Sequence, residues 1–159
     1  MTAPVAPDDK PVPIARLLAM AYRQLIDGLH GRLPEAGFTD VRPAYGFVLL
    51  AVRDRPTTIV DLAGLLGVTK QAASKLVGAM DDAGYVRRTT AATDARAKNI
   101  ELAPRGVELL NAVESIYGDL EAEWAATIGE VAVDRLRRDL SSVLLVAHEG
   151  RLPEVRPTP

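Results

Sequence analysis

The sequence contains no cysteine and only two histidines, and each shortage excludes a class of site. Without a thiol, the chain can form neither disulfides nor thiolate metal sites, and it cannot sense peroxides through cysteine. His30 and His148 lie far apart and have no metal-ligand spacing around them, which argues against a metal sensor. The sequence also has no glycine-rich phosphate loop, nucleophile elbow or HExxH motif. We therefore expect no enzyme, no cofactor and no metal.

Long apolar runs and a leader-like start are missing as well. No apolar run approaches the ~20 residues that span a bilayer, so we expect no membrane partner. The N-terminal segment MTAPVAPDDKPVP lacks the basic start and the apolar run of a signal peptide. A chain of 159 residues with 48% hydrophobic and 25% charged side chains suits one soluble globular domain, and we expect it in the cytoplasm.

The net charge of −2 is small, but it is unevenly distributed. Residues 53–106 carry nine basic and six acidic groups, whereas residues 107–159 carry five basic and ten acidic groups. Nucleic-acid binding needs positive charge on one face rather than over the whole chain. The distribution therefore permits a DNA-binding function for the middle third.

The middle third contains two short helical patterns separated by a tight turn. Thr58 can cap the first helix, with Asp61 as its capping-box partner, and Gly67 can end it. Thr69 can cap the second helix, which we expect to end before Gly84. The pattern predicts a helix–turn–helix.

The second of these helices is amphipathic. At 100° per residue, its core-facing arc consists of Ala72, Ala73, Leu76, Val77, Met80 and Ala83. The outward arc consists of Lys70, Gln71, Ser74, Lys75, Gly78 and Asp82. A helix–turn–helix reads DNA with the N-terminal part of its second helix, and lysine, glutamine and serine reach phosphates and base edges. An ordinary amphipathic helix with a solvated face remains the alternative.

A hairpin follows this helix–turn–helix. Residues 85–90 and 99–102 are strand-like, and the small, polar and charged segment between them has Asp94 and Arg96 at its tip. A hairpin in this place makes the unit a winged helix. Arginine on such a tip suits the narrow, electronegative minor groove, although a basic loop can also be merely solvated.

Further helices flank this unit. We expect one from Ile14 to about Leu29, closed by Gly31 and Pro34, and a second capped by Thr39 or Asp40 with a nearly all-apolar run. A long helix begins at Pro104, and Gly129 separates it from a last helix that ends at Gly150. The long helix has an apolar stripe that a small winged module cannot cover: Val107, Leu110, Val113, Tyr117, Leu120, Trp124 and Ile128. A two-fold dimer is the economical solution.

These elements resemble the MarR family of bacterial transcriptional regulators from about Ile14 to Gly150. The resemblance is strongest over DLAGLLGVTKQAASKLVGAMDDAGYVRR and TDARAKNIELAPRG. The second segment carries the aspartate–x–arginine motif of the family's wing, here as Asp94 and Arg96. The family's next motif, leucine–threonine–x–x–glycine, is present as Leu102 and Gly106, but Ala103 stands where threonine is usual. This departure affects helix capping rather than DNA contact.

The resemblance implies a mainly α fold with a β-hairpin wing. It assigns 14–52 and 103–150 to a helical dimerisation region and 53–102 to the winged helix, with tails at 1–13 and 151–159. It further implies a homodimer on double-stranded DNA, with a pseudo-palindromic operator whose half-sites lie about one helical turn apart. Most such proteins are repressors that a small molecule releases from DNA.

The resemblance and the outward face of the second helix together suggest roles for individual residues. Gln71 and Ser74 are candidates for base edges, and Lys70 and Lys75 for phosphates near the positive end of the helix dipole. We expect Asp94 to orient the wing, because phosphate repels a carboxylate. The full set of DNA-binding candidates is Thr69, Lys70, Gln71, Ser74, Lys75, Arg88, Asp94, Arg96 and Lys98.

A small apolar or aromatic effector remains after thiol and metal sensing are excluded. Its pocket could be lined by Tyr22, Tyr45, Phe47 and Tyr117, although each of these also suits plain core or dimer packing. The competing function is a winged helix that makes only protein contacts, which predicts no salt-dependent affinity for DNA.

Overall fold

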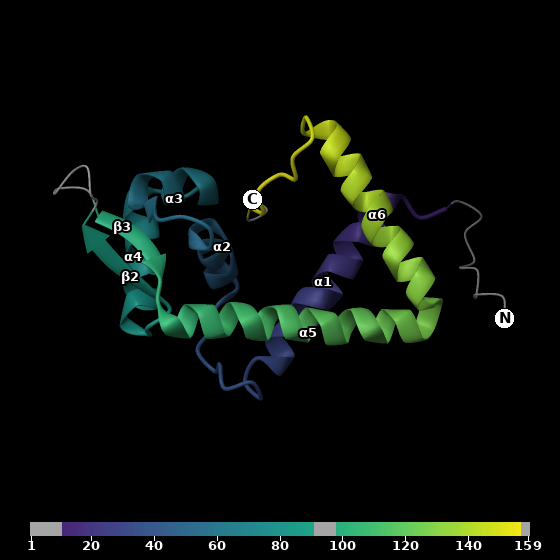
Figure 1. Cartoon of the computed structure of the whole chain (residues 1–159), viewed down its shortest axis with the longest axis horizontal. Coiled ribbons are helices and arrows are strands. Elements are labelled where there is room, and N and C mark those ends of the chain that lie inside the picture. Colours follow the sequence, from purple (N-terminus) through teal and green to yellow (C-terminus); the bar gives the residue numbers. More distant parts are fainter. Residues whose placement is uncertain (1–10, 91–97, 157–159) are drawn as a thin grey trace.

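The computed structural model describes residues 11–90 and 98–156. Within these residues, the winged helix with its small antiparallel sheet lies at one end of the long helix Pro104–Ile128, and the last helix turns back from the other end (Figure 1). No described helix is both long and apolar enough to span a membrane. The elements in chain order are α1 Ile14–Arg32, α2 Pro43–Val52, β1 Thr57–Thr58, α3 Ile59–Leu66, α4 Lys70–Asp82, β2 Val86–Thr90, β3 Lys98–Leu102, α5 Pro104–Ile128 and α6 Glu130–Ala147.

The expected caps of the helix–turn–helix are confirmed. The Thr58 hydroxyl accepts the Asp61 backbone N–H at 3.2 Å and donates to the Asp61 carboxylate at 2.8 Å. Gly67 ends α3 with a φ of +66°, a left-handed conformation that costs glycine little. The Thr69 hydroxyl accepts the Ala72 N–H at 3.1 Å and so opens α4. These local bonds fix the turn between the two helices.

The expected hairpin is also present, as β2 and β3, with Val86 opposite Leu102 and Thr90 opposite Lys98. The sheet has a third strand that we did not predict. β1 pairs with β3 so that Thr57 lies opposite Ile100, and the strand order is β1-β3-β2. Two residues are too few to show a periodicity in the sequence. The buried Thr57 hydroxyl donates to the Ala51 carbonyl at 3.2 Å, which ties β1 to the end of α2.

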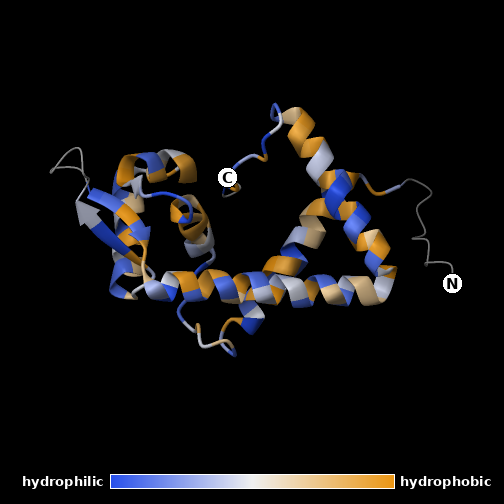
Figure 2. Cartoon of the chain, viewed as in Figure 1, coloured by the Kyte–Doolittle hydropathy of each residue, from blue (hydrophilic) through white to orange (hydrophobic). Residues whose placement is uncertain are grey.

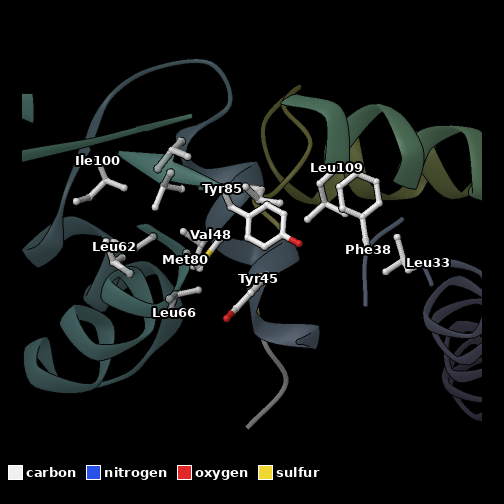
Figure 3. Close-up of a cluster of buried hydrophobic side chains, with 14 of the residues drawn as sticks. Leu33, Phe38, Tyr45, Val48, Leu62, Leu66, Met80, Tyr85, Ile100 and Leu109 are labelled. Carbon is white, nitrogen blue, oxygen red and sulfur yellow. The ribbon is translucent and has the colours of Figure 1, made fainter. Parts of the chain in front are cut away.

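The core lies where α2 meets the winged helix and the start of α5. The all-apolar run of α2 is central, as expected, with Tyr45, Val48, Leu49 and Val52 buried. Figure 3 shows side chains from α2, α3, α4, the sheet and α5 converging in one cluster. The cluster includes Leu62, Leu66, Val77, Met80, Tyr85, Ile100 and Leu109.

The expected cap of α2 is wrong. The N-cap residue is Arg42, whose side chain makes no capping bond, and Pro43 is the first helical residue. Proline has no N–H to be capped and its ring fixes a helical φ, so the helix starts there without Thr39 or Asp40. The Asp40 carboxylate instead accepts the Tyr85 hydroxyl.

Helix boundaries and faces differ in four further places. α1 continues to Arg32 with Gly31 inside it, and α6 ends at Ala147. Ala72 on α4 is exposed rather than core-facing. The buried apolar residues of α5 are Leu109, Ile116 and Leu120, of which only the last belongs to the expected stripe. The reason is that α5 contacts α2 and the strands as well as α1 and α6, so no single stripe serves all partners.

Candidate nucleic-acid interface

The N-terminal part of α4 presents polar side chains to solvent. Lys70, Gln71 and Lys75 are exposed, and Ser74 is half-buried. Ala73 and Val77 on the opposite side are fully buried, which fixes the rotation of the helix about its axis. The structure therefore brings these four candidates together on one outward surface.

Backbone groups add positive potential at the same place. The first N–H groups of a helix have no partner inside it, and the helix dipole places a partial positive charge there. Thr69 satisfies the Ala72 N–H, and the neighbouring groups of Lys70 and Gln71 belong to the exposed first turn. A phosphate at this point would meet a dipole and a lysine together.

Arg88 on β2 is turned toward α4. Its Nη2 donates to the Ser74 carbonyl at 3.2 Å, and its Nε lies 3.9 Å from the Asp81 carboxylate. The guanidinium thus links the hairpin to the outward side of α4. Arg88 thus connects β2 to α4 through its side chain. Its contact with DNA stays a prediction.

The base of the wing is held together by Glu101. This carboxylate accepts the Thr89 hydroxyl at 3.0 Å and pairs with the Arg87 guanidinium at 3.3 Å across the hairpin. Lys98 begins β3 and is exposed. The two candidates at the wing tip, Asp94 and Arg96, lie outside the described residues.

A polar cluster just after the C-terminal end of α4 was missed from the sequence. The Tyr85 hydroxyl donates to Asp40, and the Arg105 guanidinium lies 3.8 Å from the same carboxylate. The Arg105 carbon Cζ is also 5.2 Å from the ring centres of both Phe38 and Tyr85. These residues come from three distant segments, so no local pattern in the sequence could reveal their contact.

The four candidates for an effector pocket are not brought together. Tyr45 is buried in the core with its ring 5.8 Å from Tyr85, and Phe47 packs partly buried against the core. Tyr22 is half exposed on α1, and Tyr117 is half-buried on α5. The structure has open surface hollows of about 510 Å³ between α5 and α6 and about 610 Å³ between α5 and the end of α1. None of the four candidates lines either hollow.

Metal-binding groups do not gather in the described part of the chain. Over residues 11–90 and 98–156, no group of three or more histidine, aspartate or glutamate side chains lies close enough to hold an ion.

Two tyrosines are expected to make the stability of the folded state depend on pH in the alkaline range. Burial raises the pKa of Tyr85 above its ordinary value, and the hydrogen bond to Asp40 acts in the same direction. Burial also raises the pKa of Tyr117, with Tyr22 and Glu114 adding to the effect. The folded state therefore keeps these protons at a pH where the unfolded chain loses them.

We expect the free energy of unfolding to be independent of these groups below about pH 10. Above that pH it should fall, by up to about 1.4 kcal/mol per pH unit for each tyrosine. Urea unfolding from pH 8 to 11 measures the slope. The Tyr85→Phe variant should show a shallower slope than the wild type, and equal slopes would contradict the assignment.

Comparison with known proteins agrees with this geometry. Residues 39–97, which contain α2, the helix–turn–helix and β2, match the sequence model of the MarR family. Over these residues the chain is similar in sequence to the MarR family. Members of that family are transcriptional regulators and not enzymes, in agreement with the expectation from the sequence. A search of curated proteins finds no match to the chain.

Solved MarR-type structures share the fold beyond the matched residues. The reduced form of MarR from E. coli superposes with a TM-score of 0.71 at 24% identity, covering 86% of this chain and 99% of that one. The transcriptional regulator Tm0710 from Thermotoga maritima gives a TM-score of 0.69 at 22% identity, over 86% and 95% of the two chains. A point mutant of MepR from S. aureus, bound to an oligodeoxyribonucleotide, gives 0.59 at 22% identity, over 86% and 99%. At these identities the likeness establishes the fold, and both terminal helical segments are part of it.

Proposed function

We propose that this protein is a homodimeric, sequence-specific DNA-binding regulator of transcription. Each subunit would place α4 in a major groove and its wing near the adjacent minor groove. The observation that carries the proposal is the outward N-terminal surface of α4, where Lys70, Gln71 and Lys75 are exposed beside the positive end of the helix dipole. The MepR mutant that shares this fold was solved bound to an oligodeoxyribonucleotide, which supports the same use here.

Apolar side chains on the terminal helices support the dimer. Ile14 and Leu17 on α1 are 71% and 50% exposed, and Val143 and Val146 on α6 are 68% and 86% exposed. Figure 2 shows hydrophobic segments along both helices, away from the winged helix. A second copy of the chain would bury these faces. The resulting dimer would have two recognition helices, one in each subunit, related by a two-fold axis.

We further propose that the protein is a repressor that a small apolar or aromatic ligand releases from its operator. The support is the shortage of cysteine and histidine, together with the positions of Tyr22 on α1 and Tyr117 on α5, two helices that contact each other. Tyr45 and Phe47 support the ligand pocket less, because the core already contains them.

Fluorescence anisotropy tests the proposal on the DNA upstream of the protein's own gene, at two salt concentrations and with non-specific duplex as competitor. Tight binding that survives competitor would support an autoregulating DNA-binding protein. Weak, competitor-sensitive binding would call for selection of the operator from random sequences. The absence of salt-dependent binding to any duplex would favour the alternative, a winged helix that contacts only proteins.

The Lys75→Ala variant tests the phosphate contact. We expect weaker binding by a similar factor on all DNA sequences, and a salt slope reduced by about one unit, because one fewer counterion is released. Arg138→Ala is the matched control, since Arg138 is an exposed cation on α6, outside the winged helix. A salt slope that is unchanged in Lys75→Ala, or equally reduced in both variants, would remove Lys75 from the interface.

A further inference from the structure

Tyr85 is the residue at which the recognition helix, the hairpin and the long helix meet. Its N–H donates to the Met80 carbonyl at 2.8 Å, and the Gly84 N–H donates to the Asp81 carbonyl at 2.9 Å. With Gly84 at a φ of +79°, this is a Schellman motif at the end of α4. The backbone of Tyr85 is therefore fixed to the last turn of α4.

The carbonyl of Tyr85 is fixed to the start of α5. It accepts the Ala103 N–H at 3.1 Å. Gly106, in the first turn of α5, approaches so closely that an added Cβ would lie 2.0 Å from the same oxygen. The end of α4 and the beginning of α5 thus meet on one peptide unit.

The side chain of Tyr85 adds a third attachment. Its ring is fully buried and lies between Tyr45 and Phe38, as Figure 3 shows. Its hydroxyl donates to Asp40 in the connection between α1 and α2, and Arg105 of α5 lies over the ring and beside that carboxylate. The Asp40–Tyr85 bond is thus a polar tie between the helical region and the end of α4.

We propose that Tyr85, held by Asp40, is a positioning residue that sets the angle of α4 relative to α5 and thereby the half-site spacing that the dimer accepts. The inference rests on the proposed function. In a dimer built on the terminal helices and α5, a rotation at the α4–α5 junction moves both recognition helices relative to the two-fold axis. A shift of one base pair is only about 3.4 Å along the duplex, so a small rotation changes which spacing fits.

The first test compares Tyr85→Phe with Tyr45→Phe. The first change removes the hydroxyl that binds Asp40 and keeps the buried ring. The second removes a hydroxyl from a neighbouring buried ring, and that hydroxyl makes no hydrogen bond within residues 11–90 and 98–156. Each variant is titrated by fluorescence anisotropy onto the operator selected for the wild type and onto derivatives with one base pair inserted or removed between the half-sites.

We expect the wild type and Tyr45→Phe to lose affinity at least tenfold when the spacing changes. Tyr85→Phe should bind the selected operator a few-fold more weakly than the wild type does. Its affinity should fall less than threefold when the half-site spacing changes. A uniform loss across all spacings would mean that the hydroxyl only stabilises the fold, and it would overturn the inference. An unchanged profile in Tyr85→Phe would overturn it as well.

A second test needs no DNA. Because the chain has no cysteine, Asp82→Cys, at an exposed position in the last turn of α4, places one spin label on each subunit. Pulsed electron spin resonance then reports the distance between the two recognition helices. We expect a narrow distribution in the wild-type and Tyr45→Phe backgrounds and a clearly broader one with Tyr85→Phe. Distance distributions of equal width in all three backgrounds would overturn the inference. The absence of any measurable distance between two labels in a dimer would overturn it as well.

The two tests separate this inference from the proposed function. A broader distance distribution without salt-dependent DNA binding would support Tyr85 as the positioning residue of the winged helix and reject the DNA-binding role. Specific DNA binding with the same spacing profile in both tyrosine variants would keep the proposed function and reject the role of Tyr85.

Discussion

Replacing Gly106 with alanine is expected to destabilise the protein more than any other single methyl group added to α5. The new Cβ would lie 2.0 Å from the Tyr85 carbonyl oxygen and 3.0 Å from its carbonyl carbon. Both are backbone atoms of a residue that also closes the α4 turn, so neither can move without disturbing that turn. Overpacking of this kind typically costs about 1–3 kcal/mol and occasionally more, a substantial part of the stability of a typical domain.

Chemical unfolding followed by circular dichroism measures this loss. Gly64→Ala is the matched control, because Gly64 also lies inside a helix, is exposed, and has nothing within 4 Å of an added Cβ. The control should leave stability unchanged or raise it by up to about 1 kcal/mol, since alanine favours helix more than glycine does. Similar free energies of unfolding for Gly106→Ala and the wild type would show that α5 can move away from Tyr85.

The second large effect is expected from a charge on the apolar face of α6. Val143 is 68% exposed, and its face continues with Leu136, Leu140 and Leu144. In the proposed dimer, Val143→Asp would bury a carboxylate without a partner, which costs several kcal/mol. We expect a monomer in sedimentation velocity and a loss of operator affinity of at least about 100-fold, since the second half-site no longer adds to binding.

Ser142→Asp provides the control for this variant. It introduces the same charge at the adjacent exposed position, where the wild-type side chain is already polar and its hydroxyl bonds the Arg138 carbonyl at 2.8 Å. The control should remain a dimer. A Val143→Asp protein that sediments like the wild type would place the dimer contact elsewhere.

The helix–turn–helix could be predicted from the sequence because the interactions that define it are local. Thr58 and Thr69 bond to N–H groups three residues on, and Gly67 and Gly84 supply positive φ where a side chain would be strained. The hairpin followed from a change of periodicity. The order of these elements and their local motifs carried the MarR resemblance, and the family model and the solved structures confirm the fold.

The features that escaped prediction depend on contacts between distant segments. Asp40 has the character of a helix cap, yet its partner is Tyr85, which is 45 residues away. Ala72 has the character of a core residue, but the winged helix leaves it exposed. The Arg88 guanidinium donates to the Ser74 carbonyl, a contact that the sequence did not indicate, while its contact with DNA stays a prediction. In each case the residue type permits several kinds of contact, and only the tertiary arrangement determines which one forms.

The short strand β1 has a consequence for how the winged helix folds. β3 lies in the middle of the sheet, paired on one side with β2 and on the other with Thr57 and Thr58, which precede both helices of the helix–turn–helix. The complete sheet therefore requires the segments on both sides of α3 and α4 to lie together, and Ile100, which pairs with Thr57, is fully buried in it. Strand and helices should form and melt as a single cooperative unit, with the backbone amides of β3 exchanging with solvent no faster than those of α4.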